Sequence, residues 1–400
     1  YPTKIMKQII IFLFFMPLLC CGQKKIDLNQ GTIAQSTFHD TIPFELVRDK
    51  IIVAVQIQNQ KKRFIFDTGA TLMISEEIQA ENKYEALETV DQSDAVGTSR
   101  KVQLVTMDEF ELGKIKFQKI PAVVTNVKAP RFLNCLNYDG FIGSNALRNC
   151  IVQINLEDKY LVISNEISKL DIKNTFKTNL RLDKQSGPHI MTKIGEKVEF
   201  EGLFDSGSDE FMAISEDTYH KIEKKKLSRL LNNGFGSNTL ALHSIEKQQK
   251  KQRVSISGVN FGDYVIRDFV SIISSGSTEN AFGLGLAKYG NITIDYINKD
   301  FYFQPLHPIQ TFSNKTTLGF IPIPNDEYVQ VGIVWTNTNA EKLGLRSGFR
   351  ILKINDIDFS ERSAESDCAL FLQQPFKESI MTLNYIDENN EIKTITLNQE

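Results

Sequence analysis

Hydrophobic residues gather in short runs separated by polar turns over most of this chain, from about Ile42 to Pro305. Runs of this length, rich in β-branched and aromatic residues, are typical of strands. The clearest expected strands are Ile51–Ile57, Arg63–Phe66, Val102–Met107, Lys114–Phe117 and Ala122–Val127. Helical spacing is sparse and is confined to Ser75–Asn82, Glu216–Leu231 and short turns near Ala146 and Leu286. The pattern therefore predicts a mainly β fold.

Two of the apolar runs end in an aspartate that is followed by a hydroxyl residue and a glycine, as expected for a turn. One is Phe64-Ile65-Phe66-Asp67-Thr68-Gly69-Ala70, and the other is Gly202-Leu203-Phe204-Asp205-Ser206-Gly207-Ser208. Each is followed by an apolar stretch that reaches an Ile-Ser pair. One such turn usually marks an ordinary strand end. Two in the same setting indicate a paired-carboxylate site in a chain with an internal repeat.

The repeat extends beyond the two aspartates. The segment Gly140–Gly143 is followed by Ile151–Asn155, and Ala281–Gly285 is followed by Asn291–Asp295 at nearly the same offset. These segments occur in the same order in both halves of the chain, which predicts two duplicated β lobes. We expect the lobes at residues 42–164 and 187–305, joined by a polar connecting stretch.

The character of the chain changes after Pro305, and residues 311–400 are expected to form a separate, small α+β domain. This part contains a Leu-Gly-Phe segment at 318–320, an apolar run at Val329–Trp335 and a short helical pattern at Asn339–Leu345.

The N-terminus has the pattern of an export signal. Lys4 and Lys7 precede an apolar run at Ile9–Leu19 that is shorter than the roughly 20 residues of a membrane-spanning helix. We expect Met6 as the start and residues 1–22 as a signal peptide. Two processing routes fit: cleavage after residue 22, or lipidation of Cys21. Either route places the protein outside the cytoplasm, as a periplasmic, secreted or lipid-anchored chain.

Composition narrows the function classes. A formal net charge of −3 and 24% charged residues give no electrostatic signature of nucleic-acid binding. Beyond the signal, Cys135, Cys150 and Cys368 have no metal-ligand spacing, so we expect neither a metal nor a cofactor. Buried free thiols are the expected state of these cysteines, with a Cys135–Cys150 bridge as the alternative.

From Ile42 to Pro305, the two aspartate turns and the paired apolar-glycine segments resemble the aspartic proteases. The Asp-Thr-Gly-Ala form is similar to retropepsin-like lobes, and two covalently joined lobes are similar to pepsin. The resemblance implies two acid-protease β-barrel lobes with Asp67 and Asp205 as the catalytic pair. Two adjacent carboxylates share one proton, so that one can activate a water while the other polarises the peptide carbonyl.

The same resemblance gives the neighbouring residues supporting roles. The hydroxyls of Thr68 and Ser206 would cross-link the two catalytic loops. Gly69 and Gly207 would let backbone amides approach the carboxylates where a side chain would obstruct them. Ser208 is small enough for close packing and could also hydrogen-bond a carboxylate.

Enzymes of this family close hairpin flaps over the substrate. Gly97, within 93–99, is our candidate for the first lobe, and Gly234, within 232–237, is the candidate for the second. Both segments are expected to be hairpin tips.

The C-terminal residues resemble a PDZ domain from about Thr316 to Asn398. The resemblance implies that Leu318, Gly319 and Phe320 form the loop that captures a peptide carboxylate. Phe349 stands where an acidic residue is usual, and Asp356 stands where glycine is usual. The groove either binds the C-terminus of a peptide or serves only in packing and regulation.

Together these patterns predict an exported aspartic endopeptidase that acts on extended polypeptides and carries a PDZ domain. The alternative is a non-catalytic peptide-binding or scaffold protein of the cell envelope. Neither hypothesis involves nucleic acid, and both involve a membrane only through a lipid anchor.

Overall fold

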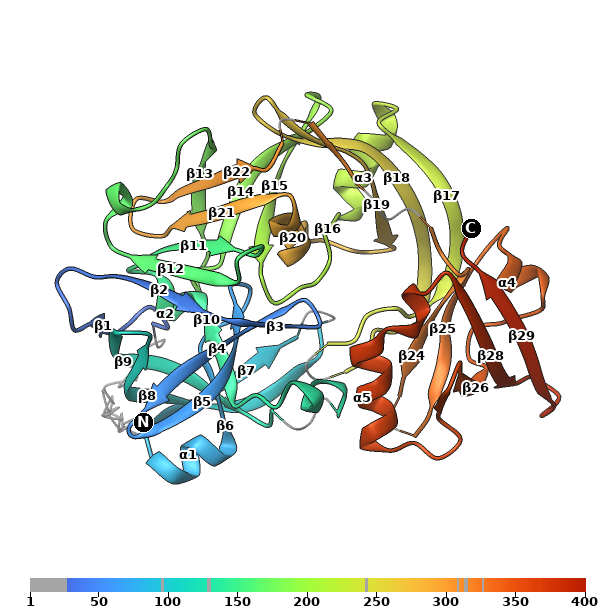
Figure 1. Ribbon diagram of the computed structural model, residues 1–400, viewed down its shortest axis with the longest axis horizontal. Coiled ribbons are helices and arrows are strands. Elements are labelled where there is room, and N and C mark those ends of the chain that lie inside the picture. The colour runs from blue at the N-terminus through green and yellow to red at the C-terminus, as the bar shows by residue number, and fades with distance from the viewer. Residues whose placement is uncertain are drawn as a thin grey trace, which may run out of the picture.

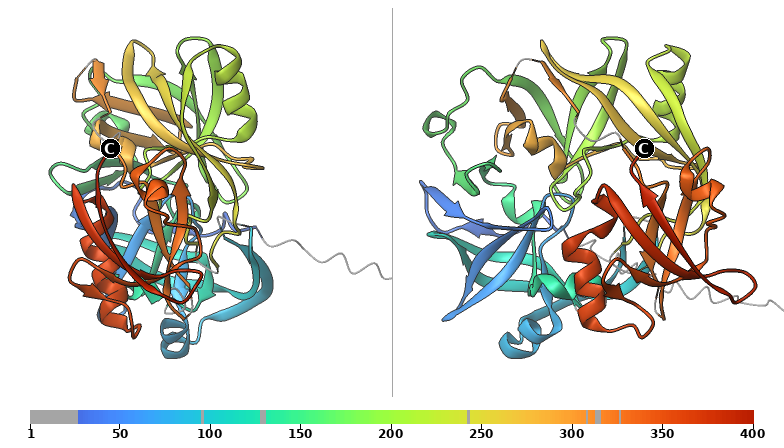
Figure 2. Two further views of the ribbon diagram at one scale, coloured as in Figure 1. Left: turned by 90° about the vertical axis from the view of Figure 1, so that its right-hand side faces the viewer. Right: turned by 45° about the vertical axis from the view of Figure 1, so that its right-hand side comes forward.

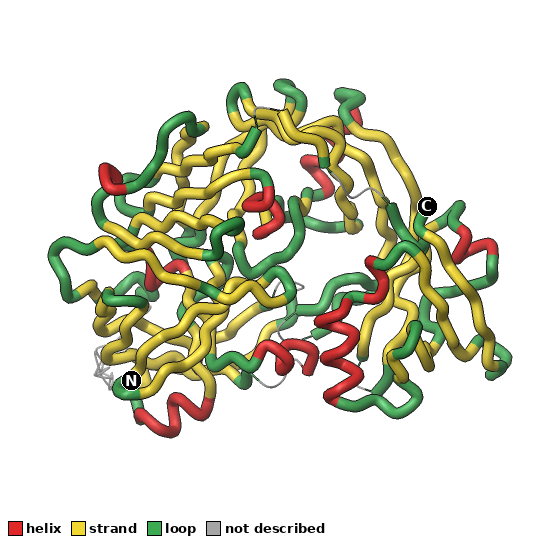
Figure 3. The backbone as a smooth tube through the Cα atoms, in the orientation of Figure 1, coloured by secondary structure: helices red, strands yellow, loops and turns green. Residues whose placement is uncertain are grey.

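The computed structural model describes residues 27–400, except 95–96, 128–130, 242–243, 308, 313–315 and 326. Most of this part is strand, with a few short helices (Figure 3). The mainly β fold expected from the sequence is therefore confirmed. The expected signal peptide and Cys21 lie outside the described residues. None of the described helices combines the length and the apolar character needed to cross a membrane.

The first β unit holds Asp67 at the end of one of its strands. Its sheet contains β1 (Thr32–Ile33), β3 (Glu45–Val47), β4 (Lys50–Ile57), β5 (Gln60–Asp67), β6 (Met73–Ser75), β7 (Glu85–Ser93), β8 (Ser99–Leu112), β9 (Ile115–Thr125) and β10 (Gly140–Gly143). The expected helix after Ile74 is α1 (Glu76–Asn82), and the Ser75 hydroxyl caps it by accepting from the Ile78 amide. The two strands expected at Lys114–Phe117 and Ala122–Val127 form a single strand, β9, because the pairing of β9 with β8 continues across the residues between them.

The second β unit is built around Asp205. It contains β14 (Pro188–Ile194), β15 (Val198–Asp205), β16 (Met212–Ala213), β17 (Ser228–Gly236), β18 (Gln249–Phe261), β19 (Tyr264–Ser274), β20 (Ala281–Gly283) and β23 (Ile309–Thr311). Helix α3 (Glu216–Lys224) is shorter than expected, and the prediction of helix as far as Leu231 is wrong. The chain turns at Lys226, whose φ is 56°, and then enters β17.

A six-stranded antiparallel sheet joins the two units (Figure 1). Its order is β2 (His39–Pro43), β12 (Tyr160–Ser164), β11 (Ile151–Asn155), β21 (Gly290–Asp295), β22 (Asp300–Pro305) and β13 (Phe176–Leu182). At its centre β11 pairs with β21, and Val152 lies opposite Ile294. The stretch between the units is therefore more than a connector, because β13 forms one edge of this sheet. Short helical turns complete the two units: α2 (Ser144–Leu147), η1 (Arg131–Leu136), η2 (Ile167–Lys169) and η3 (Leu284–Lys288).

The C-terminal unit has a hydrophobic core of its own. It contains β24 (Phe320–Pro324), β25 (Val329–Trp335), α4 (Asn339–Lys342), β26 (Arg350–Ile354), β27 (Ile357–Asp358), α5 (Ala364–Gln373), η4 (Pro375–Lys377), β28 (Ile380–Ile386) and β29 (Ile392–Asn398). Helix α5 begins at a reciprocal cap, in which the Ser363 and Ser366 side chains each accept from the other's amide. The unit lies against both β units, with α5 facing the first and β25 beside β17 of the second (Figures 1 and 2).

A disulfide joins Cys135 of η1 to Cys368 of α5. The expectation of free thiols is therefore wrong for these two residues, and the alternative Cys135–Cys150 bridge is wrong as well. Cys150 is a buried free thiol, as expected. The bond closes a long loop and ties the C-terminal unit to the first β unit.

Candidate active site

Both aspartates are placed by the same local strand arrangement. Strand β10 runs parallel to β5, with Gly143 opposite Asp67, and antiparallel to β6. Strand β20 runs parallel to β15, with Gly283 opposite Asp205, and antiparallel to β16. The phenylalanines before the aspartates, Phe66 and Phe204, are fully buried. Burial of each such side chain contributes about 1.5–3 kcal/mol and fixes the strand ends from which the carboxylates project.

The two aspartate turns are joined by four reciprocal hydrogen bonds. The Thr68 hydroxyl donates to the Phe204 carbonyl at 2.6 Å and accepts from the Ser206 amide at 3.0 Å. The Ser206 hydroxyl donates to the Phe66 carbonyl at 3.0 Å and accepts from the Thr68 amide at 3.0 Å. Thr68 and Ser206 are fully buried, so these bonds are shielded from competition with water. The structure brings both hydroxyl residues together in the cross-linking arrangement expected from the sequence.

The carboxylates of Asp67 and Asp205 are hydrogen-bonded to each other. Burial, together with the neighbouring charge and hydrogen bond of Asp205, raises the pKa of Asp67 to about 8 against the opposing charge of Lys50. Asp67 accepts one backbone amide, from Gly69 at 2.9 Å. Asp205 accepts two, from Gly207 at 2.9 Å and Ser208 at 3.2 Å. Asp205 therefore accepts one more backbone amide than Asp67 does.

Each glycine of the two turns lies against the opposite carboxylate. A Cβ atom on Gly69 would lie 2.6 Å from Cγ of Asp205, and one on Gly207 would lie closer still to Cγ of Asp67. A methyl group at either position would push the two carboxylates apart. Close approach is therefore the reason for glycine here, and it supports the sequence-based reading of Gly69 and Gly207.

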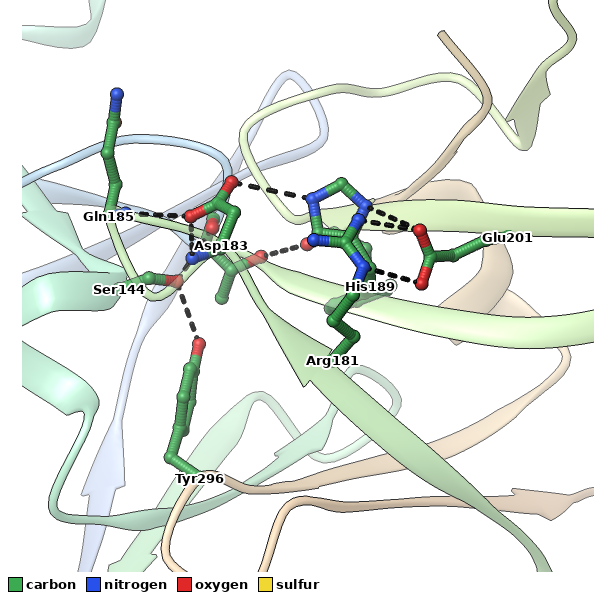
Figure 4. A network of polar contacts seen from close by, with 10 residues as sticks. Ser144, Arg181, Asp183, Gln185, His189, Glu201 and Tyr296 are labelled. Carbon is green, nitrogen blue, oxygen red and sulfur yellow. Dashed lines mark hydrogen bonds and ion pairs between the residues drawn. The ribbon is translucent and has the colours of Figure 1, made fainter.

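A serine-tyrosine contact supports the first turn from behind. The Ser144 hydroxyl donates to the Thr68 carbonyl at 2.7 Å and lies 2.9 Å from the hydroxyl of Tyr296 (Figure 4). Tyr296 follows β21 of the central six-stranded sheet, so it reaches from that sheet to the first aspartate turn. Burial raises the pKa of its hydroxyl, which therefore stays protonated and donates to Ser144. Sequence reasoning missed both residues, although Ser144 directly follows the glycine opposite Asp67.

A separate polar network includes His189 and belongs to the β13–β14 hairpin. His189 lies between Asp183 and Glu201, with its Nε2 3.4 Å from Asp183, and Arg181 forms two hydrogen bonds with Glu201 (Figure 4). These bonds hold the hairpin and its turn, so we give the network a structural role.

Basic residues from the β3–β4 turn reach the second aspartate turn. Lys50 donates from its Nζ to the Gly207 carbonyl at 2.5 Å, and Arg48 forms an ion pair with Asp209. Burial acts to raise the pKa of Asp209, but Lys50 and Arg48 outweigh it and lower that pKa to about 2. Beside it, burial and the charge of Asp209 raise the pKa of Glu210 to about 6. The sequence signal that could have found this cluster is the charged Arg-Asp-Lys turn directly before β4.

Two long hairpins, β7–β8 and β17–β18, meet at their ends. Gly97 lies in the turn of the first, with φ of 82°, as the sequence predicts. Gly234 lies inside β17, paired with β18 on one side and β25 on the other, so its expected position at a hairpin tip is wrong. The hydroxyl of Ser244, in the segment linking β17 to β18, lies 2.7 Å from the hydroxyl of Thr98 and 3.1 Å from a carboxylate oxygen of Asp94.

The Leu-Gly-Phe segment of the C-terminal unit precedes β24. Leu318 and Phe320 are buried, and Gly319 adopts φ of 85°. The Gly319 carbonyl accepts from the Trp335 amide at 2.8 Å, and its own amide donates to the Thr317 hydroxyl at 3.1 Å. The three residues are therefore held in a defined loop at the end of the sheet.

A cavity of about 920 Å³ lies between β17, β18 and α3 on one side and the C-terminal unit on the other. Tyr219, Phe235 and Leu345 are among its lining residues, and neither aspartate turn contributes to it. In the described part of the chain, no group of three or more His, Cys, Asp or Glu side chains is arranged to hold a metal ion.

Comparison with known proteins gives one family match. Residues 53–146 match the sequence profile of the aspartyl protease family. This segment contains the first aspartate turn, the β7–β8 hairpin and the strand β10 that lies opposite Asp67. A search of curated proteins returned no match to the chain. The match supports a proteolytic, hydrolase function for this protein.

Proposed function

We propose that this protein is an aspartic endopeptidase in which Asp67 and Asp205 form one catalytic pair. The observation that carries the proposal is the reciprocal bonding of Thr68 and Ser206, which holds the two carboxylates within hydrogen-bonding distance. The recurrence of the same strand arrangement around each aspartate supports two lobes that arose by duplication. The lobes are residues 42–164 and 187–305.

The geometry supports a specific division of labour. Asp205, which accepts two amides, carries the negative charge and takes a proton from a water held between the carboxyls. Asp67, protonated below about pH 8, donates to the carbonyl oxygen of the scissile peptide. Water oxygen bonds to the carbonyl carbon to form a tetrahedral diol. Proton transfer to the nitrogen then breaks the carbon–nitrogen bond and releases a carboxyl and an amine.

The two long hairpins are proposed as flaps over the cleft. Gly97 allows the tight turn of the first, and the Ser244 contact with Thr98 supports a closed position for both. An extended polypeptide bound beneath them would be the substrate.

We propose that residues 311–400 form a PDZ domain. The order of loop, two strands, short helix, two strands, longer helix and two strands supports this, as does the Leu318-Gly319-Phe320 loop with its two buried apolar side chains. Within the described residues, β24 pairs with β25 alone. Its other edge could receive an extended peptide whose carboxylate reaches the loop.

Export through residues 1–22, with or without lipidation of Cys21, is part of the proposal. The Cys135–Cys368 disulfide supports it, because such bonds persist mainly in oxidising compartments outside the cytoplasm.

The decisive experiment is cleavage of an unfolded, disulfide-free protein by the purified chain between pH 4 and pH 8. We expect cleavage that pepstatin inhibits, and a loss of about 10³-fold or more in kcat/KM in Asp67→Asn and in Asp205→Asn. Circular dichroism of each variant controls for folding. Full cleavage by the double variant would contradict the proposal.

The non-catalytic alternative predicts a different result in the same assay. A peptide-binding or scaffold protein would capture unfolded polypeptide without releasing fragments, and both substitutions would leave capture unchanged. Titration of a fluorescent peptide into wild type and the double variant separates this outcome from loss of fold.

A further inference from the structure

The C-terminal unit is attached to the second flap hairpin by strand pairing. Residues 234–236 of β17 pair with residues 333–335 of β25, so the hairpin sheet continues into the C-terminal unit. Flanking bonds extend the seam, since the Ser237 amide donates to the Gly332 carbonyl at 3.0 Å and the Thr336 amide donates to the Asn233 carbonyl at 2.8 Å. Movement of this hairpin must therefore carry the C-terminal unit with it.

The same unit is attached to the first β unit by the disulfide. Cys368 of α5 is bonded to Cys135 of η1, and the ring centroids of Phe371 of α5 and Phe132 of η1 lie 5.8 Å from each other. The chain runs from η1 into β10, which pairs with the strand that carries Asp67. The disulfide is therefore connected to the wall of the catalytic site.

A third contact brings α5 close to the second aspartate turn. Arg48 donates from Nε to the Phe371 carbonyl at 3.0 Å, and its guanidinium lies 5.1 Å from the centre of the Phe371 ring. The same guanidinium is paired with Asp209, four residues after Asp205. Only one side chain therefore separates α5 from the catalytic loop.

These attachments restrict how the cleft can open. The hairpin ends touch through Ser244 and Thr98, and in the proposed enzyme β17–β18 would move away from β7–β8 to admit a polypeptide. Because β17 carries the C-terminal unit, that movement pulls α5 away from η1. The covalent bond between Cys368 and Cys135 opposes it.

We infer that the Cys135–Cys368 disulfide is a redox latch, which keeps the flaps closed when oxidised and admits polypeptide substrates when an external dithiol reduces it. This inference rests on the proposed protease function. A thiolate of the dithiol attacks one sulfur and forms a mixed disulfide, and its second thiol then displaces the protein sulfur. The dithiol becomes a disulfide, and the protein gains two electrons and two protons as two thiols. Both cysteines are only partly buried, so the bond is accessible.

Cys150 is a natural control for this chemistry. It is fully buried, and burial raises the pKa of its thiol, so it does not form the thiolate that exchange requires. Reduction should therefore act on the described part of the chain through one bond.

The test compares cleavage of an unfolded, cysteine-free protein by oxidised wild type and by wild type reduced with dithiothreitol. We expect kcat/KM to rise by about tenfold or more on reduction, because a covalent tether holds its two ends at a high effective concentration. The double variant Cys135→Ser, Cys368→Ser should match reduced wild type under both conditions. Cys150→Ala should respond as wild type does. Equal activity of oxidised and reduced wild type, or a loss on reduction, would overturn the latch.

A second variant should release the hairpin from the C-terminal unit without a change at either cysteine. A Cβ on Gly236 would clash with the backbone of Gly332, so Gly236→Ala should separate β17 from β25. The only tryptophan of the chain, Trp335, is 1% exposed at this seam, and its fluorescence should shift to longer wavelength. Activity of this variant should be insensitive to dithiothreitol. A full redox response in a variant whose Trp335 has become exposed would contradict the mechanism.

Hydrogen exchange keeps the latch testable if the protein cleaves nothing. In Asp67→Asn, amides of β17 and β18 should exchange faster after reduction, and those of the central sheet should not change. Faster exchange without cleavage by wild type would contradict the protease proposal alone. Unchanged exchange would overturn the latch alone.

Discussion

The two aspartate turns have nearly identical internal hydrogen bonds, but the residues that surround them differ. Within the turns, Thr68 and Ser206 exchange equivalent hydrogen bonds, and a glycine follows each of them. Behind the first turn lies Ser144, whereas the corresponding position after the second glycine strand is Leu284. In front of the second turn lie Lys50 and Arg48, and the described residues show no equivalent cations bonded to the first turn.

In the proposed enzyme, these unequal surroundings would let one pair of carboxyls perform two tasks. Reciprocal bonds bring two carboxylates together, and symmetry alone would give neither of them a preferred role. The unequal surroundings supply the preference, because burial raises the pKa of Asp67 while a second backbone amide donates to Asp205.

The largest effect should appear in the pH dependence of stability. The pKa of Asp67 rises from 3.8 to about 8 on folding, so between these values the folded chain holds a proton that the unfolded chain has released. The contribution of Asp67 to stability should therefore be fully present below pH 4 and fall by up to about 1.4 kcal/mol per pH unit as pH rises to about 8. Urea unfolding should show this slope in wild type and lose most of it in Asp67→Asn.

Glu210 serves as the matched control for that measurement. Its pKa is raised only to about 6, so Glu210→Gln should flatten the curve below pH 6 and leave the slope between pH 6 and pH 8. A slope that persists unchanged in Asp67→Asn would show that the proton resides elsewhere, and the proposed asymmetry of the pair would fail.

The next largest effect should follow from adding a methyl group to either turn. Gly69→Ala and Gly207→Ala each place a Cβ against the opposite carboxyl and should reduce kcat by about 100-fold. The clash is tighter at Gly207, so this variant should lose more. Single-turnover cleavage measures the effect. An active Gly207→Ala enzyme would contradict the close approach of the two turns.

Loss of one cross-linking hydroxyl should have a moderate effect on stability. Thr68→Val removes the donor to the Phe204 carbonyl and the acceptor for the Ser206 amide, leaving two buried polar groups unpaired. The cost should be about 2 kcal/mol of unfolding free energy in urea. Ser206→Ala should cost a similar amount, and Thr68→Ser should cost little because it keeps the hydroxyl. Very unequal costs for the two turns would show that their internal symmetry is only apparent.

The smallest effect concerns the contact behind the first turn. Tyr296→Phe removes the hydroxyl that meets Ser144 and should cost about 1 kcal/mol of stability. Because Ser144 still donates to the Thr68 carbonyl, kcat should change less than threefold. A large fall in kcat with unchanged stability would instead make Tyr296 part of the catalytic machinery.

Local sequence patterns anticipated the features that depend on neighbouring residues. The apolar runs before Asp67 and Asp205 are buried strands, and Ser75 caps the expected helix. Glycine at position 234 was misleading, because its lack of a side chain serves close packing against Trp335 rather than a turn. Such a requirement arises from a partner strand far away in the sequence.

Long-range partners account for the other differences. The cysteines at positions 135 and 368 carry no local signal of their pairing, because their approach depends on how α5 docks against η1. Arg48 and Lys50 look like an ordinary charged turn until the second β unit is placed beside them. The sequence therefore anticipates the pair of aspartates better than it anticipates the groups that make them unequal.

The pairing within the central six-stranded sheet determines how the chain could be divided into two fragments. Its two halves meet where β11 pairs with β21, and the Gln153 side chain donates to the Thr293 hydroxyl across the junction at 3.0 Å. Each half, cut from the other near residue 172, would expose a strand edge that is complementary in register to its missing partner. Two fragments produced separately should therefore recognise each other and reassemble, so that this protein could serve as a split reporter whose signal is restored proteolysis.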